Sequence, residues 1–237
     1  MFGIRKRAEE RIPSGLSVLV PAVLDEAAGE NPLYRLLCGV PVVARTLLAL
    51  NQISLVDEII VVVYESEIQR MARICKDFSI GRVRKVVCAR EAGIPALTVG
   101  VYECERSAEY IAVHHPLCPF VTAEIVERAY RAALAHGAAA PGVTVRDTVK
   151  IVARDDIISE TPDRAALRAL QYPVLVESSL LKAALIKADE QGVSEKDVPA
   201  ILEALPASLR LTKGREENIQ VEEAVDIPVA EAILGWR

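Results

Sequence analysis

The 237-residue chain has few of the residues from which metal sites and disulfide frameworks are built. It contains three histidines and five cysteines, and the cysteines are scattered with no Cys-x-x-Cys pair. An odd, unpatterned set of cysteines in a chain of this length argues against a disulfide framework and a zinc knuckle. Cys88 ends the apolar run 86–88, so we expect it to be buried packing rather than a reactive group.

Long apolar runs and an excess of positive charge are also missing. No stretch approaches the roughly 20 apolar residues that a membrane span needs, and Glu9 and Glu10 stand where a signal peptide has its apolar core. The net charge of −5 argues against broad electrostatic binding to nucleic acid or to an anionic membrane. We therefore expect a cytoplasmic protein with neither of these partners, and a flexible lead-in over residues 1–15.

The residues that are abundant suit a globular α/β domain. Hydrophobic residues make up 51% and charged residues 26% of the chain, enough apolar material for a sizeable core. Short β-branched runs predict strands, and amphipathic stretches between them predict helices. The strands are expected at 17–20, 56–63, 83–88 and 110–113, and the helices at 42–53, 66–76, 96–106 and 123–135. This alternation is typical of a doubly wound, mostly parallel sheet.

Two predicted strands end in residues that could bind a ligand. The first strand runs into Pro21 and Ala22, and the strand at 110–113 runs into the adjacent pair His114 and His115. Ligands in doubly wound sheets bind at the carboxyl ends of the strands, so both segments are expected at one binding edge. The histidine pair is either a metal or proton-transfer site, or a pair of structural residues at a strand end.

The pattern changes in the second half of the chain. Residues 143–152 alternate in polarity and lead to an Asp-Asp turn at 155–156, which predicts an extended arm or hairpin. Helices are expected at 178–191, 198–204 and 227–234, with a strand near 209–211. No repeat or linker divides the chain, so residues 16–237 are predicted to form a single domain.

Six motifs occur in a characteristic order between about residue 18 and residue 234. They are "VPA", "YRLLCGVPVV", "VHHPLCP", "VRDTVK", "TPDR" and "KGREENIQV". In this order they resemble the methylerythritol phosphate cytidylyltransferase family. The resemblance implies a Rossmann-like nucleotidyltransferase fold and a homodimer joined through a projecting β-arm at about residues 140–172. It also implies transfer of CMP from CTP to a polyol phosphate with Mg²⁺ and release of pyrophosphate, in isoprenoid precursor synthesis.

The resemblance also implies roles for particular residues of this chain. Catalysis by positive charge would come from Arg146, Lys150 and Arg164. The substrate phosphate and hydroxyls would meet Arg146, Asp147, Thr148, Arg164 and Gln220, with Arg164 reaching into the partner's site. CTP would lie against Pro21, Ala22, Val23, Gly29, His114 and His115. Metal contacts would fall on Glu217, and on His115 in place of the aspartate that the family has there.

Several positions depart from the family pattern. Pro32 stands where the family has a catalytic lysine, and Asp25 and Glu26 stand in the phosphate loop, with Arg35 as a displaced basic replacement. A neutral imidazole at 115 is a poor ligand for Mg²⁺, which prefers oxygen. The base-reading segment 89–101 lacks the family's paired glycines, arginine and serine, and its Gly100 could equally be a helix-packing glycine.

The second half of the chain retains the family motifs, while the first half has lost several of them. Three hypotheses follow from this. The chain is an active cytidylyltransferase for methylerythritol phosphate or a related polyol phosphate. Alternatively, it is a catalytically degenerate paralogue, a pseudoenzyme that serves as a dimeric binding or regulatory protein. A third hypothesis is a nucleotidyltransferase that uses another nucleotide.

Overall fold

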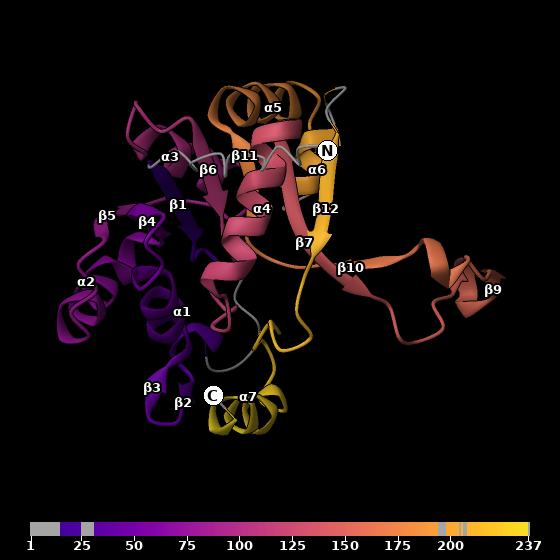
Figure 1. Ribbon diagram of the computed structural model, residues 1–237, viewed down its shortest axis with the longest axis horizontal. Coiled ribbons are helices and arrows are strands. Elements are labelled where there is room, and N and C mark those ends of the chain that lie inside the picture. Colours follow the sequence, from indigo (N-terminus) through magenta and orange to yellow (C-terminus); the bar gives the residue numbers. More distant parts are fainter. Residues whose placement is uncertain (1–14, 25–30, 194–197, 204, 206–207, 237) are drawn as a thin grey trace, which may run out of the picture.

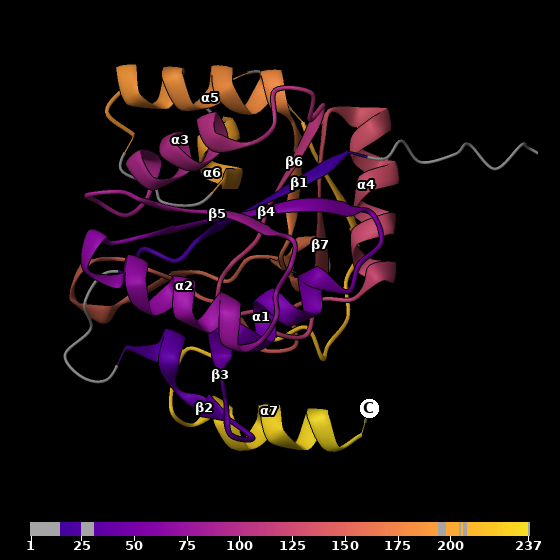
Figure 2. The same ribbon diagram turned by 90° about the vertical axis from the view of Figure 1, so that its left-hand side faces the viewer.

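The computed structural model describes residues 15–24, 31–193, 198–203, 205 and 208–236. One sheet with strand order β10-β7-β11-β6-β1-β4-β5 organises the chain, and β12 pairs with the free side of β7 (Figures 1 and 2). Its strands are β1 (Leu16–Pro21), β4 (Val56–Val63), β5 (Val83–Cys88), β6 (Tyr110–Val113), β7 (Ala138–Thr144), β10 (Arg168–Leu170), β11 (Val174–Glu177) and β12 (Leu209–Lys213). All pairings are parallel except those made by β10 and β11.

Helices cover both faces of the sheet, as the α/β alternation predicted. One core layer packs under α1 (Val42–Asn51), α2 (Ile68–Asp77), α4 (Ala123–His136) and α7 (Asp226–Gly235). The other layer packs under α3 (Ile94–Glu103), α5 (Ser178–Glu190) and α6 (Val198–Glu203), which lie on the opposite side in Figure 2. The predicted Rossmann-like, mostly parallel α/β fold is therefore confirmed. No helix in the described part of the chain is long and apolar enough to cross a membrane.

The strongest local signals give the most accurate element boundaries. β4 spans the predicted range, because its alternating faces are both covered and all but one residue is buried. Helix α4 begins after Thr122, whose hydroxyl accepts a hydrogen bond from the Ile125 amide, as an N-cap residue does. Helix α3 begins at Ile94, two residues earlier than expected, with Pro95 in its first turn.

Cys88 corrects one expectation. It is exposed rather than buried, because β5 is the edge strand of the sheet and presents much of its surface to solvent. Short elements were also missed: the hairpin of β2 (Leu36–Leu37) and β3 (Val40–Pro41), and strand β11. The lead-in 1–14, Asp25, Glu26 and Gly29 lie outside the described residues.

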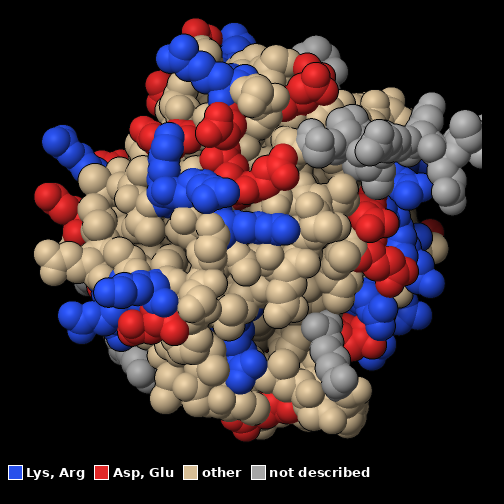
Figure 3. All heavy atoms as spheres, turned by 60° about the vertical axis from the view of Figure 1, so that its left-hand side comes forward, with Lys and Arg blue, Asp and Glu red and all other residues tan. Residues whose placement is uncertain are grey.

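An arm leaves the body of the protein between β7 and β10 (Figure 1). Its hairpin consists of β8 (Ile151–Val152) and β9 (Ile158–Glu160), paired antiparallel. The arm exposes large apolar side chains: Ile157 is 64% and Ile158 58% exposed. On the molecular face shown in Figure 3, positive and negative side chains are interspersed around a broad uncharged area.

Gly100 provides a test of the packing between α3 and the sheet. A Cβ at this position would lie 2.1 Å from Leu19 Cδ1 and 2.9 Å from Val62 Cγ2, both in the core. The glycine therefore acts as a helix-packing residue. We expect Gly100→Ala to lower the free energy of unfolding, because an overpacking cost of about 1–3 kcal/mol outweighs the helix-propensity gain of about 1 kcal/mol. Urea denaturation measures this, and Gly81→Ala, with open space around it, is the control. Equal stability of the two variants would contradict the packing role.

Candidate functional site

The carboxyl edge of the sheet brings the two predicted ligand segments together. β1 pairs in parallel with β6, so that Leu19 lies opposite Val113 and the two strands end side by side. The His114 amide donates to the Leu19 carbonyl (2.8 Å), and the Ala22 amide donates to the Val62 carbonyl (2.7 Å). Residues 21–23 and the histidine pair therefore share one edge, as the strand ends predicted.

His114 is fully buried directly after β6. Its Nε2 lies 3.0 Å from the Cys118 carbonyl oxygen, and because a carbonyl only accepts, Nε2 carries the proton. Its Nδ1 is buried with no hydrogen-bond partner among the described residues. Burial lowers the pKa of His114 to about 4, so the ring is neutral at pH 7.

His115 is also held as a neutral ring. Burial lowers its pKa to about 4, and its centroid lies 5.3 Å from that of the Tyr172 ring. Its Nδ1 accepts the Leu117 amide (3.3 Å), which leaves the proton on Nε2. Neither ring nitrogen of His115 then offers a lone pair to a metal, and the structural interpretation of this residue is the one that the geometry favours.

The described residues do not fit a magnesium ion held by the protein alone. Mg²⁺ prefers octahedral oxygen ligands, and across the described ranges no group of three His, Cys, Asp or Glu side chains is placed to hold a metal. Glu217 provides a carboxylate, but its Oε2 lies 3.4 Å from Arg215 Nε in an ion pair.

The first loop holds its basic residue away from a phosphate-binding role. Pro32 begins a short 3-10 helix (Pro32–Tyr34), where Asn31 accepts a hydrogen bond from the Leu33 amide (3.0 Å). The Arg35 guanidinium donates to the Glu222 carbonyl near the C-terminal helix. Arg35, the displaced basic residue of this loop, therefore connects two segments of the fold.

The arm brings its own basic residues together. Arg164 Nη1 donates to the Arg146 carbonyl (2.8 Å), and Lys150 Nζ donates to Thr161 Oγ1 (2.7 Å). Arg146 also forms an ion pair with Glu216 (3.2 Å), which joins the arm to the loop that follows β12. The intervening predicted residues, Asp147 and Thr148, are exposed.

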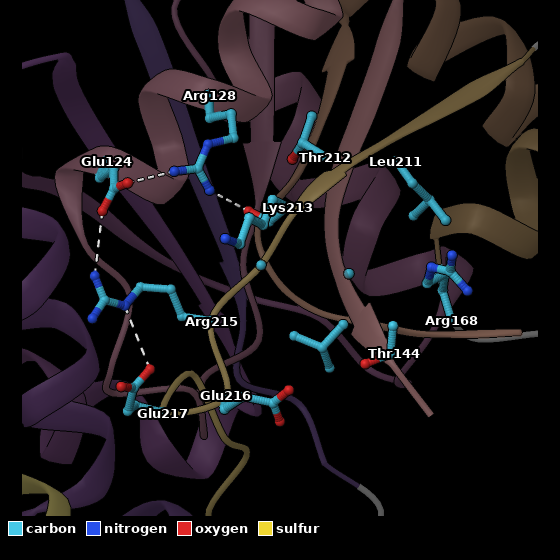
Figure 4. Close-up of a pocket in the computed structure, with 13 residues that line it drawn as sticks. Glu124, Arg128, Thr144, Arg168, Leu211, Thr212, Lys213, Arg215, Glu216 and Glu217 are labelled. Carbon is cyan, nitrogen blue, oxygen red and sulfur yellow. Dashed lines mark hydrogen bonds and ion pairs between the residues drawn. The ribbon is translucent and has the colours of Figure 1, made fainter. Parts of the chain in front are cut away.

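A pocket of about 680 Å³ opens where β7 and β12 end, next to the start of α4 (Figure 4). Along one wall Glu124 forms ion pairs with both Arg128 and Arg215, and Arg215 also forms an ion pair with Glu217. Lys213 lines the same pocket. Sequence reasoning missed Glu124 and Arg128, although their i, i+4 spacing on a predicted helix was the available signal.

Gln220 lies in the segment that returns to the histidine turn. Its Nε2 donates to Glu222 Oε2 (2.9 Å), and the adjacent Val221 amide donates to the Leu117 carbonyl (2.8 Å). The loop 214–221 thus connects the pocket, through Glu217, with the turn that carries His115.

Comparisons with known proteins agree along nearly the whole chain. The family model for IspD, 2-C-methyl-D-erythritol 4-phosphate cytidylyltransferase, matches residues 20–236. The proteins of that name from Caldanaerobacter subterraneus subsp. tengcongensis and Geobacter metallireducens are each 32% identical to the chain, over 86% and 87% of it and 90% of their own lengths. The crystal structure of 4-diphosphocytidyl-2C-methyl-D-erythritol synthase from Anaerococcus prevotii is similar in fold, with a TM-score of 0.81 at 22% identity, covering 94% of this chain and 99% of that one.

The lowered pKa of His115 predicts a pH-dependent stability. The pKa of His115 is about 4 in the folded protein and about 6.5 in the unfolded chain. Well above pH 6.5 the ring is neutral in both states. As the pH falls toward 4 the unfolded chain takes up the proton first, so the free energy of unfolding decreases. Between pH 7.5 and pH 5 the titration of His115 should lower the free energy of unfolding by about 2 kcal/mol. We expect His115→Asn to reduce the pH-dependent loss by that amount in urea denaturation. His136→Gln, at the exposed end of α4, controls for removal of a histidine, and an undiminished loss in His115→Asn would refute the assignment.

Proposed function

The chain belongs to the 2-C-methyl-D-erythritol 4-phosphate cytidylyltransferase family, and from this premise we propose that it transfers CMP from CTP to 2-C-methyl-D-erythritol 4-phosphate. The observation that carries the proposal is the family match over residues 20–236, which includes the carboxyl edge, the arm and the loop 214–221. The proposed protein is a cytoplasmic homodimer joined through its arms, with the partner's arm completing each site.

The proposed reaction is a single displacement at phosphorus. A phosphate oxygen of the polyol phosphate attacks the α-phosphorus of CTP, the bond to the β-phosphate breaks, and pyrophosphate leaves. The protein contributes alignment and positive charge rather than a covalent intermediate. Mg²⁺ enters with CTP as part of the nucleotide substrate, because the described residues do not hold it on their own.

In the proposed dimer, one chain binds the nucleotide and the partner's arm binds the substrate phosphate. The strand-end backbone at 21–23 and His115 bind the nucleotide, while His114, which is fully buried, holds the turn in place instead of meeting the ligand. The predicted contact at Gly29 lies outside the described residues. The partner's arm presents the partner's Arg146, the partner's Lys150 and the partner's Arg164 to the substrate phosphate, where a guanidinium offers paired donors. Gln220 contributes an uncharged amide to the polyol phosphate.

A second candidate function is a dimeric binding or regulatory protein that retains ligand contacts without turnover. It is favoured by one specific observation: a half-buried, neutral His115 stands at the position where the family has an aspartate for magnesium. Pro32 adds to this because it provides no charge where the family has a lysine.

Calorimetry and a pyrophosphate assay distinguish the two functions. CTP is titrated with and without Mg²⁺, and pyrophosphate release is then followed after addition of 2-C-methyl-D-erythritol 4-phosphate. Magnesium-dependent binding with release supports the cytidylyltransferase. Binding without release supports the regulatory protein, and no binding at millimolar CTP overturns the proposal that the chain uses CTP.

Arg164 tests the role of the arm in the reaction. We expect Arg164→Ala to lower kcat/KM for the polyol phosphate by about 100-fold, because a charge-assisted donor to the transferring phosphate is lost, while CTP affinity stays the same. Arg154→Ala is the matched control, because Arg154 is an exposed arginine of the same arm. A similar loss in both variants would show that arm charge in general, rather than Arg164, supports the activity.

The exposed arm isoleucines test the homodimer. We expect Ile157→Asp to shift the protein from dimer to monomer in size-exclusion chromatography with light scattering, because a charge replaces apolar surface at the proposed interface. Ile186→Asp places the same change on α5, where Ile186 is 54% exposed, and should leave the dimer intact. A dimer that persists in Ile157→Asp would contradict assembly through the arm.

A further inference from the structure

The loop 214–221 carries two of the proposed site residues, Glu217 and Gln220, yet it belongs to no helix or strand. Its ends are fixed by backbone hydrogen bonds: the Gly214 amide donates to the Gly142 carbonyl (2.9 Å), and the Val221 amide donates to the Leu117 carbonyl (2.8 Å). The middle of the loop needs other partners to take one position.

Gln171, between β10 and β11, provides those partners. Its Nε2 donates to the Arg215 carbonyl (2.7 Å) and to the Asn218 carbonyl (3.1 Å), while its Oε1 accepts the Arg215 amide (3.1 Å). Its own backbone amide donates to the Pro141 carbonyl (2.8 Å), which fixes the residue against β7. One planar amide thus contacts three backbone groups of the loop.

The loop is shaped to receive this side chain. A Cβ at Gly214 would lie 2.1 Å from Gln171 Oε1, so the absence of a side chain there allows the close approach. Asn218, 3% exposed, adds a second connection, because its Nδ2 donates to the Tyr172 carbonyl (2.9 Å). The ring of Tyr172 packs beside His115, so the same contacts extend to the carboxyl edge.

We propose that Gln171 is a positioning residue for the phosphorylated substrate: its amide sets the place of the loop, and with it Glu217 and Gln220, relative to the arm and the carboxyl edge. The inference rests on the proposed function, because that function gives the loop its substrate contacts. The pairing pattern requires glutamine, since two donors and one acceptor meet two carbonyls and one amide. The hydrogen bonds of its side chain described above all go to loop backbone, so Gln171 sets the course of the loop without occupying the side chains of Glu217 and Gln220.

Three variants test the proposal, and each should fold because the core is untouched. Gln171→Glu keeps the shape of the side chain but places a carboxylate oxygen against the two loop carbonyls that the amide nitrogen contacts. Gln171→Met keeps the length of the side chain but removes its hydrogen-bonding groups. Gly214→Ala disturbs the same contact from the loop side. Gln191→Glu, at the exposed end of α5, is the control.

Hydrogen exchange of the full-length protein and steady-state kinetics are the two measurements. In all three variants we expect amide exchange at residues 215–218 to rise at least about tenfold, with exchange in β1 and β4 unchanged. The KM for 2-C-methyl-D-erythritol 4-phosphate should rise about tenfold and the KM for CTP less than about twofold, a difference that general destabilisation would not produce.

Unchanged exchange at 215–218 would overturn the proposal, as would equal changes in the two KM values. If the unsubstituted protein releases no pyrophosphate, the proposed function fails on that result alone. Exchange at 215–218 then decides whether Gln171 positions the loop, since that measurement needs no turnover. If a Gln171 variant does not fold, the result for Gly214→Ala decides.

Discussion

The parallel pairing of β1 with β4 on one side and β6 on the other is the constraint on which the rest of the structure depends. Helices cover both faces of this strand, so it is mostly apolar, and Leu16 to Val20 are all buried. Its buried Ser17 hydrogen-bonds to Glu58 of β4, so these polar groups satisfy each other inside the sheet, and the predicted ligand segments occur where the strands end. The candidate site therefore lies at the carboxyl edge, where His114 directly follows the last apolar residue of β6, Val113.

Residue patterns within a short segment correctly predicted the elements that depend on that segment alone. The continuous run of β4 and the capped helix α4 were clear from their residues, and so was the shared edge of 21–23 and 114–115. Strand β11 was missed because it is four residues long and runs antiparallel after Pro173. The start of β7 was missed because its Ala138–Ala140 segment has low strand propensity and is fixed by neighbours on both sides. Cys88 was misjudged because apolar runs do not reveal which strand is the edge.

The contacts around Gln171 had no local signal at all. They join residues more than 40 positions apart, and an amide that binds backbone leaves no charge pattern or periodicity to detect. The ion pairs of the pocket are different, because Glu124 and Arg128 follow helical spacing. These pairs are exposed to solvent, which screens them, so they add little to stability. Their importance is geometric, since Arg215 fixes the Glu217 carboxylate at the mouth of the pocket.

The hairpin of β8 and β9 has a consequence for how the protein behaves at different concentrations. A two-stranded ribbon is marginal in water, and this one exposes apolar side chains on strands of two and three residues. In the proposed homodimer the ribbon would be ordered by the other chain, and each site would borrow groups from it. Specific activity would then depend on dilution, falling steeply near the dissociation constant of the dimer. The amount of protein that a cell makes would thus set the fraction of complete sites.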